Sequence, residues 1–187
     1  MPRLRQGLSR LRQGQRLITT QILKDMLMWT HPLVRAGIVL GLGFGGFADG
    51  IILHQILGWH HLVCVTAHCQ PTSIEHLQLQ NTQDGFFHLG LWLVSLVGTA
   101  MLFRAARHTG PEWHGRVLFG AMLAGWGLFN FVEGIIDHQI LGIHHVLPGH
   151  PHQLWFDLLF LAAGVMFFVI GTRLIHSPNS SPNQGSS

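Results

Sequence analysis

Residues 49–61, Asp-Gly-Ile-Ile-Leu-His-Gln-Ile-Leu-Gly-Trp-His-His, return 84 residues later as 133–145, Glu-Gly-Ile-Ile-Asp-His-Gln-Ile-Leu-Gly-Ile-His-His. Each copy places an acid, a His-Gln pair and a His-His pair at the same offsets within an otherwise apolar segment. Helix packing by itself does not require the same polar residues twice. The repeat therefore predicts a duplicated half-site that holds a metal ion or a cofactor.

Four segments of the chain are apolar over a length that suits a membrane-spanning helix, which needs about 20 residues. They cover residues 34–57, 86–103, 117–141 and 154–174, and the repeated motif closes the first and the third. We expect an all-α integral membrane protein in which four transmembrane helices form a bundle. The membrane domain would cover residues 34–176 as a tandem, parallel repeat of two helices, with half-repeats 34–108 and 115–176.

The distribution of charge indicates how the chain crosses the membrane. Seven of the eleven basic residues precede residue 36, and three lie between the second and third apolar segments. The two other connections, 60–83 and 142–153, contain no Lys or Arg. By the positive-inside rule, both termini are cytoplasmic and the His-rich connections face outward from a bacterial inner membrane. The basic pI is then a topology signal, and we expect no nucleic-acid partner.

The two ends of the chain differ from its apolar centre. Residues 1–33 carry Leu and Ile at helical spacing between arginines, which predicts a basic amphipathic segment on the cytoplasmic surface of the membrane. An organellar transit segment is the alternative for such an Arg-rich, acid-poor start. Residues 177–187 consist of Ser, Pro, Asn, Gln and Gly, and we expect this tail to be disordered.

Histidine is the unusual component, with fifteen residues against eight Asp and Glu together. Imidazoles with a few carboxylates suit copper, iron or zinc and disfavour calcium and magnesium. Ionisable groups inside a span are costly unless they are paired or metal-bound. The predicted ligands are His54, His60, His61, Asp84, His88, His138, His144, His145 and Asp157. Residues predicted to orient these ligands are Asp49, Gln55, Glu133, Asp137 and Gln139.

Two arrangements of these ligands are compatible with the sequence. In the first, one centre uses Asp84 with three histidines of the first half, and another uses three histidines of the second half with Glu133 or Asp157. The histidines are His54, His61 and His88 for the first centre and His138, His144 and His145 for the second. In the second arrangement, the two halves share one dinuclear centre.

Both cysteines lie in the first outward connection, with a histidine between them. Cys64, His68 and Cys69 are compatible with a local disulfide or unpaired thiols, or with an accessory site that acquires a soft metal such as Cu(I).

Two other readings of the histidines do not involve a bare metal ion. In the first, His54 and His138 ligate a haem iron, and the small residues Gly41, Gly43, Gly45 and Gly46 leave room for the ring. In the second, the polar side chains only hydrogen-bond to each other between helices.

The words Gly-Ile-x-x-His-Gln-Ile-Leu, followed by His-His and later by Asn-Thr-x-x-Asp-Gly-x-Phe-His, resemble a bacterial family of four-span membrane proteins of unknown function. The resemblance covers about residues 34–170, and the positions that match are Asp49, His54, His60, His61, Asp84, His88, Glu133, His138, His144, His145 and Asp157. Cys64, His68 and Cys69 lie outside the shared pattern. The family is associated with a cytochrome oxidase assembly protein that handles copper, which implies a metal-linked role.

These observations predict a membrane metal-binding protein with an outward-facing His/carboxylate site, most simply for copper handling or respiratory-oxidase maturation. Its partners would be the lipid bilayer and a copper chaperone or oxidase assembly protein. The alternatives are a membrane oxidoreductase with a mono- or dinuclear copper or iron centre, and a haem-binding cytochrome. Whether the protein is an enzyme stays open, because the residues include no recognisable nucleophile arrangement.

Overall fold

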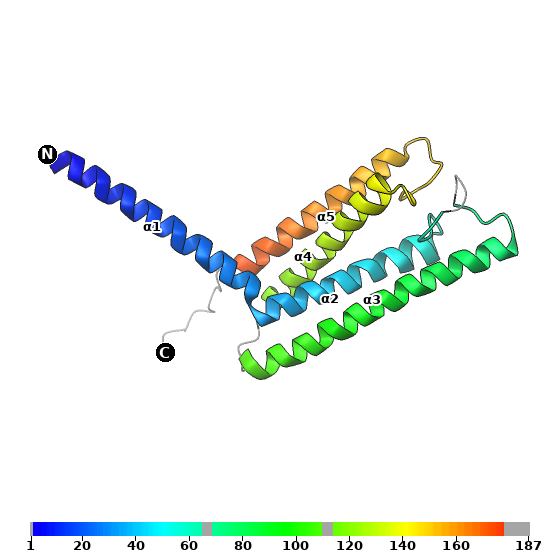
Figure 1. Cartoon of the computed structure of the whole chain (residues 1–187), viewed down its shortest axis with the longest axis horizontal. Coiled ribbons are helices and arrows are strands. Elements are labelled where there is room, and N and C mark those ends of the chain that lie inside the picture. The colour runs from blue at the N-terminus through cyan, green and yellow to red at the C-terminus, as the bar shows by residue number, and fades with distance from the viewer. Residues whose placement is uncertain (1, 65–68, 110–113, 178–187) are drawn as a thin grey trace, which may run out of the picture.

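The computed structural model describes residues 2–64, 69–109 and 114–177, and the chain there is built from helices (Figure 1). In order they are α1 Pro2–Thr30, α2 Pro32–Asp49, η1 Gly50–Ile56, α3 Ile74–Thr109, α4 Gly115–Glu133, η2 Gly134–Ile140 and α5 Gln153–His176. His68 lies outside the described residues. The tail for which we predicted disorder lies outside them as well, beyond residue 177.

Four of these helices are long and apolar enough to cross a membrane, which confirms the all-helical fold with four candidate spans. The spans are Pro32–Ile56, Ile74–Arg107, Gly115–Ile140 and Gln153–His176. The second begins twelve residues before the segment 86–103 that hydropathy indicated. Residues 74–85 are largely polar, so they form a helical extension that an apolar pattern alone does not reveal.

The four spans lie in a row rather than around a closed square. α2 and α4 pack against each other in the middle, α3 packs on α2, and α5 packs on α4 (Figure 1). The most apolar windows of the inner spans are 50% and 44% buried, against 11% and 17% for α3 and α5. The outer helices therefore expose apolar faces such as Phe86, Trp92 and Leu159, which suits contact with lipid.

Glycines allow the two inner helices to approach closely. A Cβ added at Gly41 would collide with the backbone of Met122, and one at Gly125 would collide with the carbonyl group of Ile38. The glycine stripe of α2 is thus a packing face, as small residues often are between membrane helices. This close approach brings the outer ends of α2 and α4, and with them the two copies of the motif, next to each other.

Each copy of the motif forms a short π-helix that continues an inner helix. The α2 helix passes into η1 at Gly50, and the α4 helix passes into η2 at Gly134. A π turn closes i→i+5 hydrogen bonds, such as Leu57 N–H to the Ile52 carbonyl at 2.8 Å. In an α-helix, residues five apart diverge by about 140°. The wider turn of a π-helix brings residues that are five apart towards the same side of the helix.

The first helix, α1, is separate from the row of spans and meets it at the end opposite the motif (Figure 1). The chain breaks between α1 and α2 because Pro32 begins the new helix and the His31 ring caps it by accepting from Leu33 N–H at 3.3 Å. Trp29 stacks on Phe168 with ring centroids 6.1 Å apart. The helical form of residues 2–30 agrees with the predicted amphipathic segment, and its position on a membrane surface stays a prediction.

We predict that Gly125→Ala weakens the packing of α2 on α4. The new methyl group would overlap the Ile38 carbonyl, and such overpacking destabilises a protein by about 1–3 kcal/mol. The midpoint of thermal unfolding in detergent should fall. Gly90→Ala is the matched control, because a Cβ there meets nothing within 4 Å. Equal midpoints for both variants would contradict the packing role of Gly125.

Candidate metal centre

The chain reverses at the outer end of each π-helix and returns a histidine over the helix end. Gly58 and Gly142 both have φ +57°, a left-handed conformation that glycine adopts without strain. Each of these glycines directly follows the residue that caps its π-helix. His60 and His144 follow these glycines, and their rings lie parallel at an interplanar angle of 10° with centroids 4.6 Å apart.

Two equivalent triads meet at this point, each with one acid and two histidines. The first triad is Asp49, His54 and His60, and the second is Glu133, His138 and His144. A ligand atom from each member of the first triad lies within 4.8 Å of the others, and the same holds for the second triad together with His60. Two segments 84 residues apart thus form one cluster of six metal-ligating side chains.

The triads are buried, and their facing atoms lack hydrogen bonds. The six side chains are between 0% and 7% exposed. Within the described chain, no hydrogen-bond partner reaches the Nε2 atoms of the four histidines, both carboxylate oxygens of Asp49 or Oε2 of Glu133. His54 Nε2 lies 3.1 Å from Asp49 Oδ2, and His144 Nε2 lies 3.8 Å from Glu133 Oε1. Buried polar atoms of this kind normally have partners, so the cluster has the donor set that a cation would satisfy.

The other ring nitrogen, Nδ1, is held from behind in three of these four histidines. His54 Nδ1 lies 3.0 Å from Asp84 Oδ1. His60 Nδ1 lies 2.8 Å from the carbonyl oxygen of Val146, and His144 Nδ1 lies 3.0 Å from that of Leu62. When Nδ1 carries the hydrogen and donates it to these oxygens, Nε2 presents its lone pair to the cluster.

The backbone contacts of His60 and His144 cross between the two copies of the motif. His60 of the first copy reaches Val146, and His144 of the second copy reaches Leu62. Leu62 and Val146 occupy the same position in their respective copies, so the exchange is reciprocal. Each half therefore orients a histidine that belongs to the other half.

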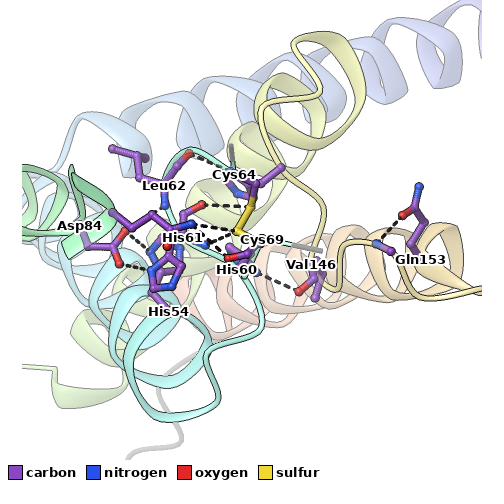
Figure 2. The surroundings of a disulfide bond; sticks show 12 residues. His54, His60, His61, Leu62, Cys64, Cys69, Asp84, Val146 and Gln153 are labelled. Carbon is purple, nitrogen blue, oxygen red and sulfur yellow. Dashed lines mark hydrogen bonds and ion pairs between the residues drawn. A yellow bond between two sulfur atoms is a disulfide. The ribbon is translucent and has the colours of Figure 1, made fainter. Parts of the chain in front are cut away.

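Asp84 and Asp157 play equivalent supporting roles and do not face the cluster centre. Oxygens of Asp84 accept hydrogen bonds from Leu62 N–H at 2.9 Å and Gln55 Nε2 at 3.0 Å, and one lies 2.6 Å from His61 Nδ1 (Figure 2). Asp157 does the same with Val146 N–H, Gln139 Nε2 and His145 Nδ1, at 2.9, 3.5 and 2.7 Å. These contacts occupy the carboxylates, which we had predicted to be ligands.

The structure places the two pairs of acids differently from what α-helical spacing suggested, and which pair would bind a metal stays a prediction. Asp49 and Glu133, predicted to orient ligands, lie in the two triads. Asp84 and Asp157, predicted as ligands, hold the histidines from outside. The reason is the π-helix, because its wide turn places Asp49 beside His54 and Glu133 on the side of His138, an effect that α-helical spacing does not show.

Other predicted ligands lie at the margin of the cluster. His61 and His145 turn Nδ1 towards Asp84 and Asp157, and they are partly exposed. His88 Nδ1 bonds to the carbonyl oxygen of Asp84 on its own helix at 2.8 Å. Of the first separate centre that we predicted, Asp84 contacts His54 and His61, whereas His88 bonds to the backbone of Asp84. The groups of side chains that could hold a metal ion draw instead on both halves. Gln55 and Gln139 bond to Asp84 and Asp157, Asp137 lies at one side of the cluster, and which of these residues bind or orient a metal stays a prediction.

Burial keeps His60 and His144, the triad histidines that lie outside the candidate spans, in their neutral form. It lowers the pKa of His60 from its usual 6.5 to about 3, which outweighs the nearby Asp49 carboxylate that raises it. Burial also lowers the pKa of His144, against the backbone hydrogen bond to Leu62. Neutral imidazole is the form that binds metals, so both rings are prepared for coordination at neutral pH.

The two cysteines form a disulfide next to the cluster (Figure 2). In this state Cys64 and Cys69 have no thiolate to offer, so the Cu(I) acquisition site is not formed. His61 N–H lies 3.3 Å from Cys69 Sγ, and Gln80 Nε2 donates to the Cys69 carbonyl oxygen at 3.1 Å. These contacts fasten Cys69 beside the first copy of the motif.

The glycine stripe of α2 does not leave space for a haem. A Cβ at Gly43 would meet the Ser95 side chain, one at Gly45 would lie 2.8 Å from Trp126, and one at Gly46 would meet Leu91. Side chains and backbone of α3 and α4 already fill the room that the haem reading required.

The fold and the cluster define an integral membrane protein with four candidate spans and buried histidines and acids that can hold a metal ion. Over residues 36–178 the chain matches the model of a family described as "Predicted membrane protein (DUF2243)". The chain therefore belongs to this family, which confirms the resemblance seen in its motifs. No curated protein and no solved structure matches it.

Sequence reasoning missed the backbone groups of the site. The carbonyl oxygens of Leu62 and Val146 orient His60 and His144, and their N–H groups bind Asp84 and Asp157. Their side chains are ordinary apolar groups, so residue type carries no signal. Their matching position after the two His-His pairs was the available clue.

We predict that Asp84→Asn weakens metal binding about 10- to 100-fold, the usual cost of removing an orienting partner. The amide keeps the shape of the side chain but has only one acceptor oxygen for His54, His61 and Leu62 N–H. Competition with a chelator of known affinity measures the change. Glu75→Gln, in the exposed first turn of the same helix, is the control and should behave as wild type. If Asp84→Asn binds the metal as tightly as wild type, the Asp84 carboxylate does not help to orient the ligands.

Proposed function

We propose that the protein is a membrane oxidoreductase built around a resident dinuclear transition-metal centre. The observation that carries this proposal is the convergence of two equivalent acid–His–His triads, whose facing nitrogen and oxygen atoms lie close together without hydrogen bonds among the described residues. One ion would be bound by Asp49, His54 and His60. The other would be bound by Glu133, His138 and His144.

The number of ligands supports a reactive centre. Each triad supplies three protein ligands, whereas structural sites usually satisfy their ion with four. Two imidazoles with one carboxylate and open positions form a ligand set that proteins use for redox chemistry at iron. Such a centre would have room for a small molecule at each ion.

The burial of the triads distinguishes this function from metal handling. A carrier that exchanges its ion with a partner needs ligands at an open mouth, but here the six side chains are at most 7% exposed. The disulfide also withdraws the two sulfur atoms that a Cu(I) carrier would use. Copper handling or oxidase maturation remains the second candidate, supported by the partly exposed His61 and His145 at the outer margin.

Copper and iron are the metals that this proposal requires, because zinc has no redox chemistry. The imidazole and carboxylate ligands accept either metal. The resemblance that links the family to copper assembly makes copper the first metal to test. A copper chaperone or an oxidase assembly protein would be the partner in that case.

We infer that the two halves are a parallel duplication related by a pseudo-two-fold axis along the membrane normal. The reciprocal contacts of His60 and His144, and the matching contacts of Asp84 and Asp157, support this relation. Both copies of the motif lie at the same end of the bundle (Figure 1). The arginines near the opposite end would then place the metal centre towards the outside.

The centre predicts a specific loss of metal in single variants. Wild-type protein purified in detergent should contain two ions per chain, and His54→Ala and His138→Ala should each lose at least one. A dinuclear centre also predicts magnetic coupling, so electron paramagnetic resonance should change when one ion is lost. Elemental analysis identifies the metal and counts it.

The control for these variants is His152→Ala, which removes an exposed histidine of the same outer turn and should leave the metal content unchanged. Full metal content in both His54→Ala and His138→Ala would refute the centre. A metal that exchanges within minutes with a chelator would instead support the carrier function.

The orientation of the chain gives a separate prediction. If both termini are cytoplasmic, green fluorescent protein fused after residue 187 should fluoresce, and alkaline phosphatase at the same point should be inactive. Phosphatase inserted after Gly149, in the second outer turn, should be active. The opposite pattern of activities would place the metal centre towards the cytoplasm.

A further inference from the structure

A cavity of about 260 Å³ lies beside the second triad. Its walls come from α4 and η2, with one residue each from α2 and α3, and its lining consists of Leu42, Phe87, Leu128, Phe129, Val132, Glu133, Ile136 and Asp137. All eight residues belong to the candidate membrane spans. The cavity is thus at membrane depth, with six apolar side chains and two acids.

The cavity joins the membrane-exposed surface to the metal cluster. Val132 and Ile136 at its rim are 44% and 42% exposed. Glu133 is only 7% exposed and its Oε2 is closed off, whereas Asp137 further along the wall is partly exposed. A molecule that enters from the hydrocarbon region therefore meets an apolar rim first and a hydrogen-bond acceptor inside.

A residue of the histidine cluster, His54, holds the aromatic wall of the cavity in place. Phe87 stacks on the ring of His54 with centroids 5.5 Å apart and an interplanar angle of 17°. Phe87 and Phe129 lie 6.3 Å apart. Flat aromatic walls favour a flat guest, because ring pairs gain energy from offset or edge contacts.

The two halves of the repeat differ at this cavity. The position of Leu42 corresponds to Trp126 in the second half, and Trp126 fills the equivalent space by packing on Gly45 and on Phe167 at 5.4 Å. The position of Asp137 corresponds to Leu53 in the first half. Leu42 in place of a tryptophan leaves space, and Asp137 in place of a leucine adds a carboxylate. Both residues line the same cavity.

We propose that this cavity binds the ring of a membrane-soluble quinol, whose hydroxyl groups donate hydrogen bonds to the carboxylates of Glu133 and Asp137. Pockets for small molecules usually measure about 300–1,000 Å³, so a cavity slightly below this range suits a single ring whose isoprenoid tail stays in the bilayer.

Charge and hydrogen bonding exclude the other molecules of the bilayer. Two acids repel the phosphate group of a phospholipid. An acyl chain has no donor and would cover the Asp137 carboxylate without a hydrogen bond in return, which costs free energy. A quinol supplies both the donors and the apolar ring. Leu42 and Asp137 belong to neither triad, so variants at these two positions test the proposal separately from the dinuclear centre.

Binding can be tested with decylubiquinol on the full-length protein in lipid nanodiscs under anaerobic conditions, with the retained quinol measured by chromatography. Wild type should bind one equivalent. Leu42→Trp, which copies the residue of the second half, should fill the cavity and abolish retention. Asp137→Leu, which copies the residue of the first half, should weaken binding about tenfold or more, the usual loss for a hydrogen bond to a charged group.

Controls separate this result from general damage. Leu159→Trp adds the same ring to an apolar surface of α5 that is 65% exposed, and it should bind like wild type. Metal content in Leu42→Trp should also stay as in wild type, because Leu42 lies in neither triad. The proposal is overturned if wild type retains no quinol, or if both Leu42→Trp and Asp137→Leu retain it fully. Retention of phospholipid in place of quinol would overturn it too.

Discussion

The end of the molecule that carries the two motifs depends on how its buried ionisable atoms find partners. Two acid–His–His triads point atoms at each other that have no hydrogen-bond partner in the described chain. Leaving such groups unpaired in a low-dielectric interior costs on the order of a few kcal/mol each, and a cation between them would remove that cost. In His54, His60 and His144, the contacts of the Nδ1 atoms determine which nitrogen of the ring faces inward.

The packing of the inner helices makes this cluster sufficiently rigid to hold an ion. Glycines such as Gly41 and Gly125 bring α2 and α4 into backbone contact, so the two motifs cannot separate without unpacking the bundle. The reciprocal backbone contacts of His60 and His144 join the loops above them. Rigid ligands favour a resident centre over a site that releases its metal, because release would need these contacts to open.

The two copies of the motif agree at the clustered acids and histidines and differ beside them. The residues of the triads and those that hydrogen-bond to them are the same or chemically equivalent in both copies, including Asp49 with Glu133. Leu42 and Asp137, by contrast, differ in size or charge from Trp126 and Leu53. The cavity therefore lies beside one triad, so two ions bound in the cluster would have unequal surroundings.

The sequence by itself determined the four apolar helices, the repeated motif and the set of polar residues around the site, because hydropathy and exact repetition are local properties. Only the tertiary structure decided that Asp49 and Glu133 face the cluster while Asp84 and Asp157 stand behind it. That choice depends on the π-helical turn and on backbone groups of Leu62 and Val146 from the opposite half, and neither leaves a mark in residue type.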